Sequence, residues 1–194
     1  MLLLLLTVAC GERDTGKSES SDICDTADTG LTQVGVIDLE CRCEESTVTI
    51  GSGIQAYEPI EDGSCLQMVH GPQGGWHLPG ALLAGNTRNI VEILAWAEWE
   101  GQPITDELSY RVQLVPGELG TCDGSFPNMF LYLTSKYIDD ELRPPEIIAC
   151  EEVTITMCVD DTGGNASCGD LTVIVAPDPA DVTNELVAPC GLCP

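Results

Sequence analysis

The chain has 194 residues, of which 32 are acidic and 7 are basic, so its formal net charge is −25 at pH 7. Such a charge repels phosphate backbones and anionic lipid headgroups at long range, which excludes nucleic acid as a partner and is compatible with a soluble surface or a cationic partner. The length is enough for one domain with a real core and for tails, and we expect one domain.

The chain opens with the apolar run MLLLLLTVA, which Cys10 follows. This run is too short to span a bilayer as a helix, for which about 20 residues are needed, and it is typical of a signal sequence. Residues 6–10, LTVAC, resemble the lipobox of bacterial lipoproteins. The resemblance implies a signal sequence over 1–9 and a membrane anchor through lipidated Cys10. Gly11 resembles the sorting signal for the outer membrane, so we expect the protein in the cell envelope.

The cysteine count supports the same interpretation. The chain has 11 cysteines, and an odd number in a secreted protein leaves one thiol to explain. If Cys10 carries the lipid, the other ten can form five disulfides in an oxidising compartment. Zinc is the competing use, but there is only one CxxC pair and no second pair at zinc-finger spacing. The predicted disulfide cysteines are Cys24, Cys41, Cys43, Cys65, Cys122, Cys150, Cys158, Cys168, Cys190 and Cys193.

Residues 10–33 are expected to form the lipidated Cys and a flexible polar tether, because few apolar side chains are present to offset the entropy of ordering. Residues 34–180 carry short β-branched runs separated by Gly, Pro and Asp, which predicts a β-sandwich domain. We expect residues 181–194 to be a Cys-rich tail packed on that domain. The expected strands are 34–40, 46–50, 65–70, 76–84, 90–98, 108–115, 129–134, 152–159 and 170–176.

One segment admits two structures. Asn89 and Glu92 fit the first turn of a helix, whereas Val91, Ile93 and every second residue as far as Trp99 fit a strand. We choose the strand.

A hairpin is predicted near the end of the chain, where two runs of period two flank the turn DDTGGN. A disulfide between Cys158 and Cys168 would cross this hairpin if both side chains lie on one face. Residues 152–179 resemble the last two strands of bacterial immunoglobulin-like domains. The resemblance implies an all-β fold, an immunoglobulin-like antiparallel β-sandwich, and we expect the disulfides to cross-link it.

Cys41 and Cys43 lie two residues apart on an expected strand, so both point to one face. We therefore expect them to pair with two different partners. The candidates are Cys24, Cys190 and Cys193.

The two histidines of the chain stand in one short run, LQMVHGPQGGWH, over residues 66–77. Its GPQGGWH segment resembles a motif of uncharacterised bacterial lipoproteins with β-sandwich domains, a resemblance that implies no activity. A hairpin that pairs His70 with His77 would place both imidazoles side by side, with Met68 on the same face. Two imidazoles and a thioether suit copper. A register shifted by one residue would separate the histidines, which could instead pack a loop and face water.

No enzyme site is predicted. Ser52 and Ser64 lack a nucleophile elbow, and no pair of acids is singled out for glycoside hydrolysis. Cys190 and Cys193 form a CxxC pair, but Pro189 and Pro194 bracket it and favour structural disulfides over thiol redox chemistry.

The sequence therefore predicts a membrane-anchored lipoprotein that acts as a non-catalytic binding or structural module of the envelope, without a cofactor. Its partners would be the membrane, reached through the lipid, and a protein or cationic ligand, and no small-molecule substrate is identifiable. The alternative is a copper-binding lipoprotein that uses Met68, His70 and His77.

Overall fold

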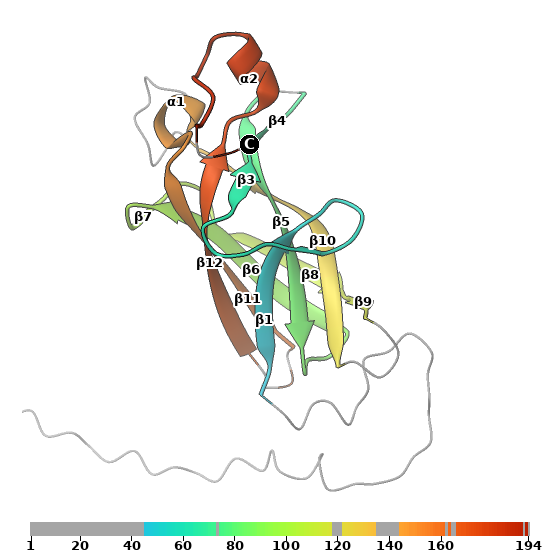
Figure 1. Cartoon of the computed structure of the whole chain (residues 1–194). Coiled ribbons are helices and arrows are strands. Elements are labelled where there is room, and N and C mark those ends of the chain that lie inside the picture. The colour runs from blue at the N-terminus through green and yellow to red at the C-terminus, as the bar shows by residue number, and fades with distance from the viewer. Residues whose placement is uncertain are drawn as a thin grey trace, which may run out of the picture. The chain divides into compact units, whose positions relative to one another are not determined.

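Two β-sheets make up most of the protein, as the computed structural model in Figure 1 shows. The structure describes residues 45–72, 74–117, 122–134, 144–161, 163, 166–191 and 193. Sheet A contains β1 (Thr47–Ser52), β2 (Glu58–Pro59), β4 (Val69–His70), β5 (Trp76–Gly85), β9 (Val115–Pro116) and β10 (Asp123–Tyr132). Sheet B contains β3 (Cys65–Gln67), β6 (Ile90–Trp99), β7 (Gln102–Pro103), β8 (Leu108–Gln113), β11 (Glu152–Asp160) and β12 (Ala166–Ala176). Two short helices, α1 (Pro144–Ile148) and α2 (Pro179–Thr183), complete the described elements.

The strand order is β2-β1-β5-β10-β9 in sheet A, where β4 also pairs with β5. In sheet B the order is β3-β12-β11-β6-β7, and β8 also pairs with β6. The described pairs are antiparallel, except that β3 runs parallel to β12. None of the helices in the described part of the chain is long and apolar enough to span a membrane.

The core lies between the two sheets and follows from the period-two pattern of the strands. In β11, Val153, Ile155 and Met157 are buried, and the residues between them are half-buried on the outer face. Buried side chains of β1, β5 and β10 join them in one apolar cluster. Burying one such side chain contributes about 1.5–3 kcal/mol, so this shared core holds the sheets together. The predicted all-β sandwich is confirmed.

The strand predicted for the ambiguous segment is also confirmed, since Ile90–Trp99 forms β6 between β11 and β8. The expected strand 129–134 overlaps the end of β10, which begins six residues earlier, at Asp123, and ends at Tyr132. Its register shifts between Phe126 and Met129, at a bulge where Asn128 has a left-handed backbone with φ 64°. Strand 34–40, the signal sequence, the tether, Cys10, Cys24, Cys41 and Cys43 lie outside the described residues.

The two ends of the sandwich differ. The chain enters β1 at Thr47, which pairs with Gly85 at one end of β5. At the other end of β5, Trp76 pairs with β4, and both helices lie near β3 and β4 there (Figure 1). We call this second end, with α1, α2 and β4, the capped end.

Candidate functional site

The GPQGGWH segment forms the tight hairpin between β4 and β5. The Gly71 N–H donates to the carbonyl oxygen of Gly75 over 2.9 Å, and the Gly74 N–H donates to that of Gly71 over 3.0 Å. Gly74 and Gly75 both have φ 85°, a left-handed conformation that glycine adopts without steric cost. This loop pairs His70 with Trp76, and Val69 with His77.

The pairing of His70 with His77, which the copper alternative required, differs from the observed register by one residue. Because side chains alternate between the faces of a strand, the shift places the two imidazoles on opposite faces. Met68 is fully buried in the core. The arrangement on which the copper hypothesis depended is not formed, and we do not propose copper binding by these three residues together. Among the described residues, no three His, Cys, Asp or Glu side chains are grouped as metal ligands.

His77 lies on the outer face of sheet A, against the aromatic side chains of β10. Its ring contacts Phe130 edge-on, with 4.6 Å between centroids, and lies 5.6 Å from the ring of Tyr132. Burial lowers the pKa of His77, and the nearby Asp178 carboxylate opposes this shift. This imidazole packs as a largely neutral ring rather than as an exposed cation.

His70 lies on the other face and forms a polar cluster with the C-terminal helix. Its ring stacks on Trp76 with 4.7 Å between centroids, and its Nδ1 lies 3.0 Å from Oδ1 of Asp181. The Trp76 indole N–H donates to Oδ2 of the same carboxylate over 2.7 Å. Asp181 is only 2% exposed, so both carboxylate oxygens are engaged in a nearly water-free position.

Asp178 completes this cluster and begins α2. Its Oδ1 accepts from the Ala180 N–H over 2.8 Å as the N-cap, with Pro179 at the first helical position. Its Oδ2 accepts from the backbone N–H of His70 over 2.8 Å. We call His70, Trp76, Asp178 and Asp181 the capping cluster, since together they fix α2 on the β4–β5 hairpin.

The capping cluster was only half predicted. His70 and Trp76 stand in an unusual run that the sequence shows, whereas no prediction was made for Asp178. An Asp followed by Pro is the signature of a helix N-cap with Pro at the first helical position, and this signal could have located α2. Nothing in the sequence indicates that Asp181 meets a hairpin more than a hundred residues away.

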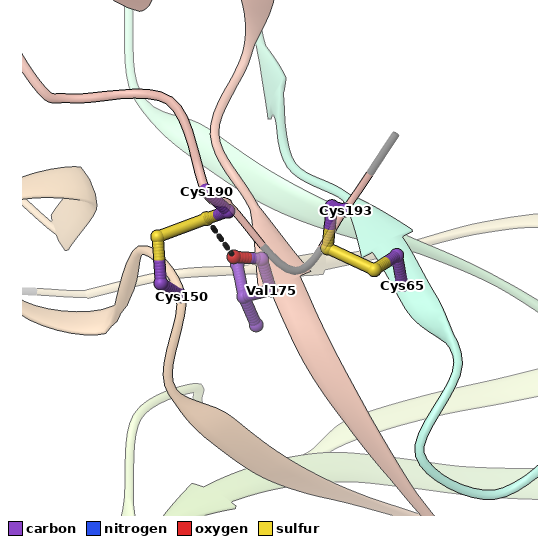
Figure 2. Close-up of a disulfide and its surroundings, with 5 residues drawn as sticks. All are labelled: Cys65, Cys150, Val175, Cys190 and Cys193. Atoms are coloured by element: carbon purple, nitrogen blue, oxygen red, sulfur yellow. Dashed lines mark hydrogen bonds between the residues drawn. A yellow bond between two sulfur atoms is a disulfide. The ribbon is translucent and has the colours of Figure 1, made fainter.

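The described cysteines are all disulfide-bonded. Cys158 and Cys168 face each other across β11 and β12 and are bonded as predicted. At the capped end the bonds are Cys65–Cys193 and Cys150–Cys190, which flank β12 at Val175 (Figure 2).

The bonds at the capped end correct one expectation. Cys190 and Cys193 were candidate partners of Cys41 and Cys43, but each is bonded elsewhere. The reason is the position of the tail, which runs back over the end of β12 and places the Cys190 sulfur 3.7 Å from the carbonyl oxygen of Val175 (Figure 2). Cys190 and Cys193 of the CxxC pair thus each form a disulfide with another cysteine and not with each other.

A cavity of about 490 Å³ opens beside these disulfides on sheet B. We call it the acidic groove. Glu100, Gly101, Glu151 and Glu152 are its exposed lining residues, and Trp99, Cys150, Thr154, Thr172 and Ile174 are its half-buried ones. No sequence pattern pointed to it, because its walls come from strand ends that are distant along the chain.

The two walls of the acidic groove are held by backbone contacts. Glu100 and Gly101 form a two-residue turn between β6 and β7, with φ 50° and 74°, as in a type I′ turn. Opposite them, the Cys150 N–H donates to Val175 over 2.7 Å, and the Val175 N–H donates back to Glu151 over 3.0 Å. These bonds and the Cys150–Cys190 disulfide fix the second wall to β12.

No protein-family model matches the chain, and no curated protein matches its sequence.

Proposed function

We propose that this chain is a bacterial lipoprotein of the cell envelope, anchored in the outer membrane through Cys10, whose sandwich is a non-catalytic binding module. Residues 1–9 would be removed on export, and residues 10–33 would tether the domain to the membrane.

The state of the cysteines is the observation that carries this proposal. All cysteines of the described part are oxidised, and structural disulfides persist in secreted proteins rather than in the reducing cytosol. A protein exported with such an apolar run is either anchored in a membrane or released in soluble form. The resemblance of LTVAC to a lipobox favours the anchor.

The proposed tether would join the sandwich on the side of β1, and the capped end lies at the other end of β5. The chain reaches Thr47 at one end of β5, and Trp76 begins β5 at the other. Ten residues of strand span about 33 Å, so the capped end lies about that far from the end of the sandwich at which β1 begins.

The capping cluster supports a structural rather than a catalytic use of the histidines. His70 is engaged by Asp181, Asp178 and Trp76, and His77 is packed against aromatic rings. Both imidazole rings thus contact other elements of the domain and help to hold these elements together.

Fractionation of a bacterial host that makes the full chain tests the anchor. The wild-type chain is expected in the membrane fraction after a high-salt wash, to be released only by detergent, because a lipid chain rather than charge retains it. The Cys10→Ser variant is expected in the soluble fraction, and the Ser21→Ala variant, changed in the same polar segment, should behave as the wild type. Cys10→Ser remaining in the membrane would overturn the proposed anchor.

A further inference from the structure

Cys122, which directly precedes β10, has a disulfide partner outside the described part of the chain. Its side chain is half-buried and disulfide-bonded. The other six described cysteines bond to one another, as Cys65–Cys193, Cys150–Cys190 and Cys158–Cys168. The partner of Cys122 is therefore one of the remaining cysteines of the sequence, which all precede β1: Cys10, Cys24, Cys41 and Cys43.

The starts of β1 and β10 lie close together in sheet A. Thr47 of β1 and Asp123 of β10 both pair with Gly85, from opposite sides of β5. Two spacings between neighbouring strands put them about 10 Å apart. Because β1 and β10 are both antiparallel to β5, they run in the same direction. Cys122 and the residues that lead into β1 therefore enter the sheet at the same end.

Asn86 joins these two entering segments. Its backbone N–H donates to the carbonyl oxygen of Cys122, and its side-chain Nδ2 donates to that of Glu45, both over 3.0 Å. Gly85 leaves room between them, since a Cβ at this position would lie 2.6 Å from Oγ1 of Thr47 and 3.0 Å from Oδ1 of Asp123. Glu45 thus lies on the other side of Asn86 from Cys122.

Cys43 needs the shortest connection to reach Cys122. It precedes Thr47 by four residues, and four residues span up to about 14 Å, which is enough to close the gap between the two strands. A disulfide itself joins Cα atoms about 5.5 Å apart. Cys41 precedes Thr47 by six residues and Cys24 by 23, and closing a longer loop costs more conformational entropy.

We infer that Cys43 and Cys122 form a disulfide, which bonds the segment before β1 to the start of β10. Its formation transfers two electrons and two protons from the two thiols to a disulfide-bearing oxidoreductase, whose own disulfide becomes two thiols. Cys10 is excluded as the partner because it would carry the lipid, a step that rests on the proposed function. A pull on the proposed anchor would then reach sheet A through β1 and β10 together.

Tryptic peptide mapping without reductant tests the inference on the full chain, extracted in neutral detergent and alkylated. Arg42 lies between Cys41 and Cys43, so cleavage after Arg42 separates these two candidates. The three peptides that decide the question are 18–42 with Cys24 and Cys41, 43–88 with Cys43 and Cys65, and 112–136 with Cys122.

Mass spectrometry is expected to find peptide 112–136 linked to peptide 43–88, with fragment ions that place the bond at Cys43, and to lose this link after reduction. A link from 112–136 to 18–42, a bond at Cys65, or alkylation of Cys122 without reduction would overturn the inference and leave the proposed anchor untouched. A link from Cys122 to Cys10 would overturn both. The two failures are therefore distinguishable.

A matched pair of variants checks the assignment independently. Cys43→Ala should abolish the link between peptides 112–136 and 43–88, because no other cysteine of 43–88 is open to Cys122 while Cys65 is bonded to Cys193. Cys41→Ala removes the neighbouring cysteine and should keep the link. Persistence of the link in Cys43→Ala, or its loss in Cys41→Ala, would contradict a bond between Cys43 and Cys122.

Discussion

Asp181 is a carboxylate that the fold buries, and its two oxygens contact the indole of Trp76 and the imidazole of His70. A buried carboxylate is costly unless donors satisfy its oxygens. Here each oxygen has one, and both donors come from the hairpin while the acceptor comes from α2. A single residue therefore couples α2 to the β4–β5 hairpin.

Replacing Asp181 tests this coupling. Asp181→Leu would leave the Trp76 indole N–H buried without an acceptor, so we predict a loss of about 1–3 kcal/mol in the free energy of unfolding. Asp181→Asn keeps one acceptor oxygen and should lose less. Urea denaturation at pH 7 measures both, and Glu107→Leu, which removes an exposed carboxylate, should change stability by less than about 0.5 kcal/mol. Equal effects of Asp181→Leu and Glu107→Leu would show that the capping cluster does not hold α2.

The residue scale also shows where prediction from sequence fails. The run from Gly71 to Gly75 indicated a hairpin correctly, but a Gly-rich loop can close at more than one length, and the alternating pattern does not fix which residues face each other. The core and the capping cluster decide it: Trp76 points inwards, onto the core and Asp181. Those contacts come from residues far along the chain, so the sequence near His70 could not reveal them.

Single elements were predicted best where their pattern was long and regular. β11 and β12 alternate over at least nine residues around a turn rich in Asp and Gly, and both strands and their disulfide were identified. β10 was recognised only in part, because Gly124, Pro127 and Asn128 break its pattern at the bulge. The acidic groove could not be predicted, since it depends on the approach of the β6–β7 turn to the start of β11.

The disulfides make a testable contribution at this scale. Cys65–Cys193 joins residues 128 apart in the sequence, and Cys158–Cys168 joins residues 10 apart within a hairpin that its strand register already closes. Chain entropy predicts a loss of about 5 kcal/mol for the paired Ala variant of the first bond and about 3 kcal/mol for that of the second. Urea unfolding without reductant measures both losses. A smaller loss for the Cys65/Cys193 variant than for the Cys158/Cys168 variant would contradict the view that the long bond holds the tail on the sandwich.

The whole molecule combines one shared core, a capped end fixed by disulfides and a polar cluster, and a large negative charge. The fold class followed from composition and strand pattern, because short β-branched runs without helical periods can bury their apolar faces only against another sheet. The capped end did not follow, because it is assembled from β4, α2 and the cysteines of the tail. It lies at the end of β5 opposite to the end at which Thr47 pairs with Gly85.

The intact mass of the mature protein, extracted from the membrane without reductant, tests the proposed lipoprotein most directly. We predict the mass of residues 10–194 with an acyl modification at Cys10 and with ten hydrogens lost, because the other ten cysteines would form five disulfides. Treatment with a reductant should restore those hydrogens and leave the acyl mass in place. A mass equal to the unmodified chain from Met1, or to residues 10–194 without acyl groups, would contradict the anchor and with it the proposed place of this protein in the envelope.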